Sequence, residues 1–225
     1  MASESTEMYL SVIYRLTCKA ERATVSEIAS ALGISLPSVS EKVKHLADQK
    51  LVLHEWREGV TLTARGTRIA LKMLRKRRLI ETFLVEMAGY ELDEVHEDAC
   101  RLEHAVSDRL ADRLDAILGH PEMDPHGHPI PNRDGTVAQI CYVPLSEFKP
   151  GAVLVCRRLE CLIKPDGLSF LCDKGITPGA RFRVEAVDED TGAFTLRLRH
   201  ARVEIAPELV ESIRVTPVGT ATARS

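Results

Sequence analysis

Residues 24–50, TVSEIASALGISLPSVSEKVKHLADQK, decide the fold of the N-terminal part of this chain. Thr24 and Glu27 stand three residues apart, which is the spacing of a capping box, and they predict a short helix that ends in a tight turn at Gly33. Ser35 then has the position of a second N-cap, in front of another short amphipathic helix. Two short helices joined by a tight turn predict a helix-turn-helix.

A predicted hairpin follows the two helices. Residues 51–53 and 60–62 are short apolar segments on either side of a turn near Glu58 and Gly59, and a hairpin in this place is the wing of a winged helix. Capped helix pairs also occur in all-α domains that bind no DNA. The hairpin and the basic residues around it favour the DNA-binding interpretation.

The second helix, residues 36–49, is expected to enter the major groove with its N-terminal turn first. Candidate DNA contacts at its start are Ser35, Pro37, Ser38, Ser40, Glu41 and Lys44. Ser38 can hydrogen-bond a base, Pro37 can touch a thymine methyl group and Glu41 can accept from a cytosine amino group, whereas the other three lie nearer phosphates. Because few long polar side chains face the bases, DNA shape is expected to supply part of the specificity.

Charge is distributed unevenly along the chain. Residues 1–78 carry 14 Lys+Arg against 8 Asp+Glu, residues 79–145 carry 4 against 14, and residues 146–225 carry 12 against 11. The formal net charge of -3 is therefore the sum over a basic part, which suits phosphate, an acidic part, which suits a cation, and a nearly neutral remainder. The run RKRR at residues 75–78 fits either a phosphate-contacting patch or a solvated helix face.

The acidic part holds candidate metal ligands. On a helix that is expected to run to Leu118, four side chains share one face at i, i+4, i+7 and i+8, namely His96, Cys100, Glu103 and His104. Burying imidazole, thiol and carboxylate groups together without a cation would leave polar groups unpaired, so a divalent metal site is favoured. Cys100 and His104 could also be the nucleophile and base of a cytoplasmic thiol enzyme, but no oxyanion-hole or pocket motif accompanies them.

The remaining sequence predicts a loop and a β domain. A stretch rich in Pro, Gly and His, including DPHGHPIP at residues 124–131, predicts a long loop or linker. Its histidines His120, His126 and His128 could form a surface metal site, but loop histidines are more often solvated. Short alternating segments with Pro-Gly and Thr-Gly turns then predict a small all-β barrel, followed by a frayed tail at residues 220–225.

Composition indicates a cytoplasmic protein without a membrane partner. No apolar run approaches the length of a membrane span, and residues 1–7 lack the features of a signal peptide. The six cysteines, Cys161 among them, form no CxxC pair and no disulfide-dense pattern, so thiols or metal ligands are expected.

Taken together, these motifs resemble the diphtheria toxin repressor family, which includes iron-dependent and manganese-dependent regulators. The matching stretches are TEMYL at 6–10, PSVS at 37–40, LTARG at 62–66, VHEDACRLEHAVSD at 95–108 and GHPIP at 127–131. The stretches LSEFKPG at 145–151 and GITPG at 175–179 resemble the SH3-like, FeoA-type barrel that such regulators often carry. The resemblance covers almost the whole chain.

The resemblance implies a mainly α protein with a C-terminal β domain. Residues 1–74 would form a winged helix-turn-helix DNA-binding domain, residues 75–140 a helical metal-binding and dimerisation domain with a Pro-rich linker, and residues 141–225 the SH3-like barrel. It implies a repressor, not an enzyme, that is activated by a metal and binds palindromic operator DNA as a homodimer to control metal homeostasis.

The resemblance also implies a primary metal site, made of Met8, Cys100, Glu103 and His104. The manganese branch of the family has Asp and Glu where this chain has Met8 and Cys100. Thioether and thiolate are softer ligands than carboxylates, so iron(II) is the expected metal and manganese(II) the second choice.

An ancillary metal site is implied at Glu81 and His96, but Arg77 stands where the family has a histidine ligand. Lys164 and Gly167 stand where the barrel would supply a Glu and a Gln. Because a guanidinium stays protonated and cannot coordinate a metal, this site is expected to be lost or rebuilt, with Arg77 paired to Glu81 or His96.

Overall fold

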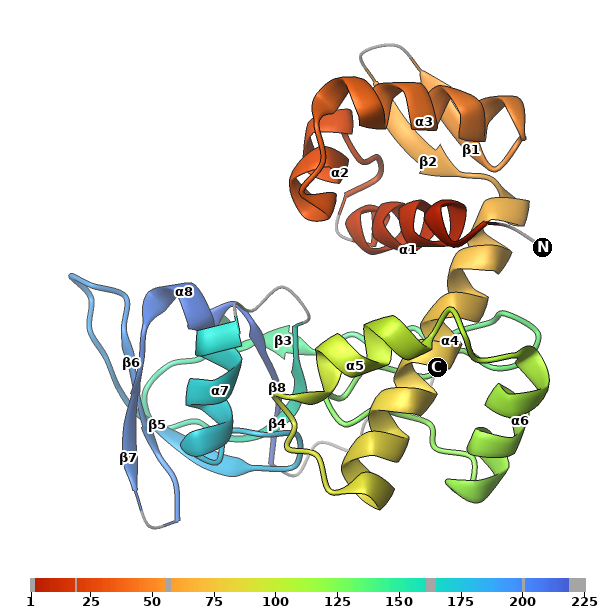
Figure 1. Ribbon diagram of the computed structural model, residues 1–225. Coiled ribbons are helices and arrows are strands. Elements are labelled where there is room, and N and C mark those ends of the chain that lie inside the picture. Colours follow the sequence, from red (N-terminus) through yellow and green to blue (C-terminus); the bar gives the residue numbers. More distant parts are fainter. Residues whose placement is uncertain (1–2, 19, 56–57, 161–164, 200, 219–225) are drawn as a thin grey trace. The chain divides into compact units, whose positions relative to one another are not determined.

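The computed structural model describes residues 3–18, 20–55, 58–160, 165–199 and 201–218. Cys161, Lys164 and the predicted tail at residues 220–225 lie outside these ranges. The chain forms two compact units (Figure 1): Met1–Ile80 with Ala99–His120 and Ile130–Ala138, and Glu81–Asp98 with Pro121–Pro129 and Gln139–Ser225. In the described part, no helix is long and apolar enough to cross a membrane.

The N-terminal elements confirm the winged helix. They are α1 (Glu4–Thr17), α2 (Val25–Leu32), α3 (Leu36–Asp48) and an antiparallel hairpin of β1 (Val52–Glu55) and β2 (Gly59–Leu62). The capping box of Thr24 and Glu27 is present, and Gly33 ends α2 with a φ of 65°. Ser35 is the N-cap residue of α3, as predicted, but its hydroxyl makes no cap bond and lies 2.9 Å from the hydroxyl of Ser38.

Three helices follow the wing: α4 (Ala64–Ala88), α5 (Val95–Leu102) and α6 (Asp108–Ile117). The predicted single helix up to Leu118 is wrong, because the chain leaves the helix after Leu102 and starts again at Ser107. The Ser107 side chain accepts a hydrogen bond from the N–H of Leu110 and so caps α6. The break leaves Glu103 and His104 in the turn between two helices.

The C-terminal domain is a six-stranded antiparallel sheet in the order β3-β8-β4-β5-β6-β7. The strands are β3 (Val143–Pro144), β4 (Val153–Leu159), β5 (Arg181–Val187), β6 (Phe194–Arg197), β7 (Arg202–Ile205) and β8 (Ile213–Pro217). The short helices η1 (Leu145–Glu147), α7 (Pro165–Asp173) and α8 (Pro207–Val210) contribute Leu145, Leu171 and Val210 to its core. Within the described residues the sheet is open, with β3 and β7 at its edges, so the expected barrel closure is not seen.

The Pro, Gly and His-rich segment is irregular, as predicted, but it is packed. Asp124 and His128 are each 6% exposed and His126 is 9% exposed. The Asp124 carboxylate accepts hydrogen bonds from the N–H groups of His126, at 3.0 Å, and His128, at 2.8 Å. The expectation of solvated histidines is therefore wrong for these two, because one buried carboxylate folds the loop around itself.

Substitution of Gly127, at the centre of this loop, is predicted to destabilise the fold strongly. It has a φ of 87°, and a Cβ atom there would lie 2.0 Å from the carbonyl oxygen of Arg157. Gly135 has a similar φ of 78°, but a Cβ would meet only the Arg68 Cγ, at 3.8 Å. In urea unfolding, Gly135→Ala should cost about 1–2 kcal/mol from backbone strain alone. Gly127→Ala should cost about 1–3 kcal/mol more, and equal losses would contradict the tight packing.

Candidate metal centre and nucleic-acid interface

The first turns of α3 present a polar surface. The six predicted DNA-contacting residues, Ser35 to Lys44, are all exposed. On the opposite side of α3, Val39, Val43 and Leu46 are fully buried, and this fixes which face of the helix points outward. The side chain of Lys42 is turned back, with its Nζ donating to the Thr6 hydroxyl at 3.3 Å.

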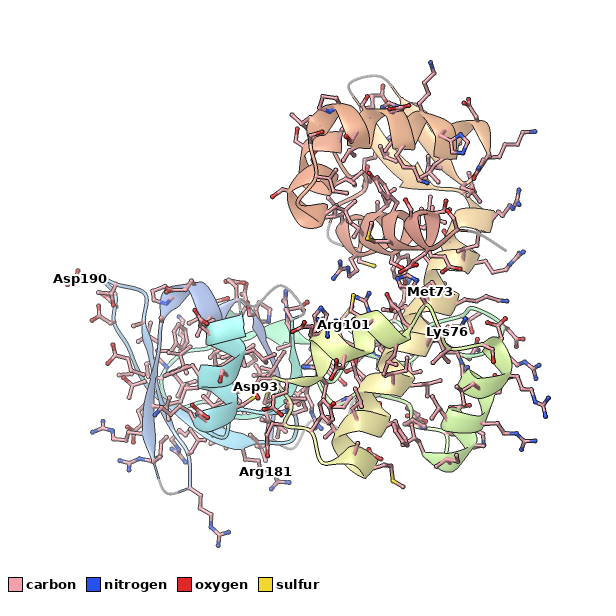
Figure 2. The ribbon with its side chains drawn as sticks, viewed as in Figure 1. Met73, Lys76, Asp93, Arg101, Arg181 and Asp190 are labelled. Atoms are coloured by element: carbon pink, nitrogen blue, oxygen red, sulfur yellow. The ribbon has the colours of Figure 1, made fainter. Side chains whose placement is uncertain are left out.

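The basic run at residues 75–78 fits neither predicted role, because it is engaged within the protein. Arg75 is 8% exposed, and its guanidinium lies 3.3 Å from Asp112 and 3.1 Å from Asp115 of α6. Lys76, labelled in Figure 2, lies 3.2 Å from Asp108, at the start of α6. Local sequence did not reveal these pairs, because their partners lie more than 30 positions away.

Two predicted metal ligands lie at the end of α5. The Glu103 N–H donates to the Ala99 carbonyl at 3.0 Å, which turns the Glu103 side chain inward, and this residue is only 1% exposed. The His104 Nε2 lies 3.6 Å from the Glu103 Oε1. Cys100, one turn earlier on α5, is exposed at the surface. These three residues and Met8 belong to the same compact unit.

Arg77 occupies the space between these groups. Its Nε donates to Glu103 Oε2 at 2.7 Å, and its Nη2 donates to Glu103 Oε1 at 2.5 Å and to the Cys100 Sγ at 3.8 Å. Glu103 is thus a partner of Arg77 that was not expected, and the predicted pairing of Arg77 with Glu81 or His96 stays a prediction. One guanidinium thus bridges two of the four predicted ligands.

Glu7 is a site residue that the sequence analysis missed. Its Oε2 lies 3.2 Å from the His104 Nδ1. A carboxylate on one imidazole nitrogen orients the ring and leaves the other nitrogen available, which is the arrangement that supports many metal-bound histidines. Met8 is the next residue on α1 and is 37% exposed. The motif at residues 6–10 pointed to this place but not to Glu7.

The predicted shared face is present for His96 and Cys100, which stand four residues apart on α5, but wrong for Glu103 and His104, which follow the end of that helix. His96 is grouped with the other compact unit, where its Nδ1 is 3.4 Å from the Glu81 Oε1. In the same unit, the ligand atoms of Glu81, Asp124 and His126 all lie within 4.8 Å of one another. Among the described residues, this is the one group of three or more His, Cys, Asp or Glu side chains packed so closely.

Cys156 and Cys172 are unsuited to metal binding. Burial raises the pKa of Cys156 to about 12 and the pKa of Cys172 to about 11. Both thiols therefore stay protonated near neutral pH, and a metal needs the thiolate. Cys100, exposed and next to a carboxylate and an imidazole, is the cysteine whose neighbours fit a transition metal.

A winged helix with an exposed recognition helix, together with thiol, carboxylate and imidazole groups on one helix end, defines a DNA-binding protein of the metal-responsive class. Residues 1–60 match the family described as iron dependent repressor, N-terminal DNA binding domain, and residues 63–132 match its metal binding and dimerisation domain. The chain belongs to this family of metal-dependent transcriptional repressors, which includes the diphtheria toxin repressor. Residues 143–217 match the FeoA domain.

Individual relatives cover the chain almost end to end. The iron-dependent repressor IdeR of Mycobacterium leprae is 31% identical over 226 residues, which are 96% of this chain and 98% of that protein. The diphtheria toxin repressor of Corynebacterium diphtheriae is 31% identical over 94% of this chain and 96% of its own length. These comparisons support the repressor interpretation and not the alternative of a thiol enzyme.

Solved structures agree on the fold. A manganese-dependent transcriptional repressor in complex with manganese has a TM-score of 0.85 and 37% identity, over 95% of this chain and all of that chain. ScaR with bound Zn²⁺ has a TM-score of 0.81 and 31% identity, over 95% of this chain and 99% of that chain.

Proposed function

We propose that this chain represses transcription when iron(II), or secondarily manganese(II), binds at Met8, Cys100, Glu103 and His104, and that it then binds a palindromic operator as a homodimer to control metal homeostasis. The observation that carries this proposal is the buried carboxylate of Glu103, with Cys100 and His104 around it, in the same unit as an exposed recognition helix. The division at residues 74 and 140 and the SH3-like character of residues 141–225 are part of the same proposal.

The donor set fits a divalent transition metal of the iron type. The carboxylate of Glu103 lies 3.6 Å from the His104 imidazole, Arg77 links it to the Cys100 thiol, and α1 carries a thioether next to Glu7. Soft sulfur donors favour iron(II) over manganese(II) at otherwise similar sites. When bound, the metal would supply two positive charges that neutralise the Glu103 carboxylate and the Cys100 thiolate together.

The ligands connect the DNA-binding helices to the α5–α6 turn. Met8 lies on α1, which packs in the same core as α3, whereas the other three lie at and after the end of α5. Joining the two favours one arrangement of the recognition helix over others. In a two-fold dimer this arrangement sets the distance between two recognition helices, which must match half-sites about one helical turn apart. Leu110 and Ile117 of α6, 47% and 61% exposed, are candidates for the dimer face.

A second cation is proposed at Glu81, Asp124 and His126, with His96 beside Glu81. This is a rebuilt form of the ancillary site expected at Glu81 and His96, in which residues of the packed loop replace the ligand lost at Arg77. Two buried carboxylates and an imidazole whose ligand atoms lie within 4.8 Å of one another are a donor set that a divalent transition metal accepts.

Cys100→Ala should uncouple DNA binding from the metal. The DNA is a palindrome selected from a random pool by the wild-type protein with iron(II), and binding is measured by fluorescence anisotropy with metal and with chelator. Wild type should bind at least about tenfold tighter with metal, within the usual range of allosteric coupling, whereas Cys100→Ala should show almost no difference. Cys141→Ala, at another exposed cysteine, is the control. An unchanged metal response in Cys100→Ala would refute the proposed ligand set.

Lys44→Ala should weaken binding to the selected palindrome and to random DNA by similar factors, because its ammonium is expected to contact phosphate. The slope of log affinity against log salt should fall by about 1. Lys174→Ala, in the C-terminal domain, should leave the two affinities and the salt slope unchanged. A loss confined to the palindrome would instead assign Lys44 to base recognition.

His126→Ala should remove one bound metal ion from the protein without removing the ion that depends on Cys100. Titration calorimetry with manganese(II) measures this stoichiometry in His126→Ala, in Cys100→Ala and in the variant that carries both substitutions. His120→Ala is the matched control, since His120 is exposed and paired with Asp115 at 3.0 Å. Unchanged stoichiometry in His126→Ala would show that the second cluster holds no metal.

A further inference from the structure

Glu103 is neutralised by Arg77 within the chain itself. The side chains of Glu103 and Arg77 are 2% and 12% exposed, and both carboxylate oxygens accept from the guanidinium. A buried carboxylate requires a cation close to it, and the forked guanidinium matches a carboxylate in geometry as well as charge. The metal-free protein therefore already carries a cation at the place proposed for the metal.

Arg77 contacts the same atoms that a metal at this place would use. A metal would take a lone pair of a Glu103 oxygen and of the Cys100 sulfur, and Arg77 Nη2 donates to the Glu103 Oε1, at 2.5 Å, and to the Cys100 Sγ, at 3.8 Å. The guanidinium cannot give up its proton to become a ligand. If it remained close to the bound dication, the two positive charges would repel each other in a poorly solvated site.

We propose that Arg77 is a tethered competitor of the activating metal, which sets the metal concentration at which the repressor switches. This inference rests on the proposed metal site at Glu103 and Cys100. Metal entry exchanges one cation for another: the guanidinium leaves Glu103 as the metal binds. The metal-free state is thereby stabilised, and only a metal that outcompetes Arg77 can activate the protein.

The opposite role for Arg77 makes the opposite prediction. A residue that stays on Glu103 and orients it as a ligand would support metal binding, as outer-shell partners of metal ligands commonly do. Removing such a residue weakens metal binding, whereas removing a competitor strengthens it. The sign of the change in affinity therefore separates the two roles.

The test uses cobalt(II), because its thiolate absorption band reports coordination by Cys100. Arg77→Gln should bind cobalt(II) at least about tenfold tighter than wild type, on the scale by which one opposite charge shifts a neighbouring carboxyl pKa. The metal-free variant should melt at a lower temperature than wild type, since Glu103 stays buried without its partner, and cobalt(II) should raise its melting temperature by more. Lys76→Gln removes a positive charge from the preceding residue of α4, whose partner is Asp108, and should leave the affinity for cobalt(II) unchanged.

Arg77→Lys is the second variant and decides the matter if Arg77→Gln does not fold. It keeps the charge but not the fork, so its affinity should fall between those of wild type and Arg77→Gln. Equal or weaker cobalt(II) binding in the Arg77 variants overturns the competitor role. Binding in the variants but not in wild type supports that role and refutes metal activation of the natural protein, whereas a missing thiolate band in every protein refutes both.

Discussion

The first compact unit depends on one constraint. The basic face of α4 pairs with acidic side chains between Glu103 and Asp115. Arg75 bonds Asp112 and Asp115, Lys76 bonds Asp108 and Arg77 bonds Glu103. Removing one partner of a buried pair leaves an uncompensated charge and typically costs about 3–5 kcal/mol. These pairs therefore hold α6 and the turn before it, with Glu103 and His104, against α4.

A further and more exposed pair on α4, Lys72 with Asp108, shows how the arrangement depends on pH. The Lys72 hydrogen bond to Asp108, with a contribution from Lys76, holds the pKa of that carboxyl below its usual range. A carboxyl whose pKa is lower in the folded state contributes stability above its unfolded pKa, and that contribution is lost as the pH falls through the folded pKa. Because Asp108 is largely exposed, its contribution is small, and the buried arginine pairs do most of the holding.

Local signals predicted the elements that depend on local contacts. The capping box at Thr24, the left-handed Gly33 and the wing all involve residues a few positions apart, and all are present. The proposed ligands Cys100, Glu103 and His104 were predicted from the same kind of signal, since they lie within five positions of one another. The helix was nevertheless expected to continue through them, because Ser107 was not recognised as a cap that starts a new helix.

The features that the sequence did not disclose depend on distant partners. The run at residues 75–78 was interpreted from its charge alone, and its partners lie 26 to 40 positions further on. The histidines at 126 and 128 looked solvated, because a segment rich in Pro and Gly is typical of a loop, whereas Asp124 folds this segment into a buried turn that brings His126 to Glu81. Position along the chain does not show which charges a fold will bring together.

The internal pairing also changes the meaning of the basic N-terminal part. Much of its positive excess lies at residues 75–78, and those charges are used to balance carboxylates rather than to attract phosphate. DNA binding then depends on the cations that stay exposed, of which Lys44 on α3 is one. A dimer brings two such surfaces to DNA together, so the metal proposed to join α1 to the α5–α6 turn would control repression through the spacing of the two copies.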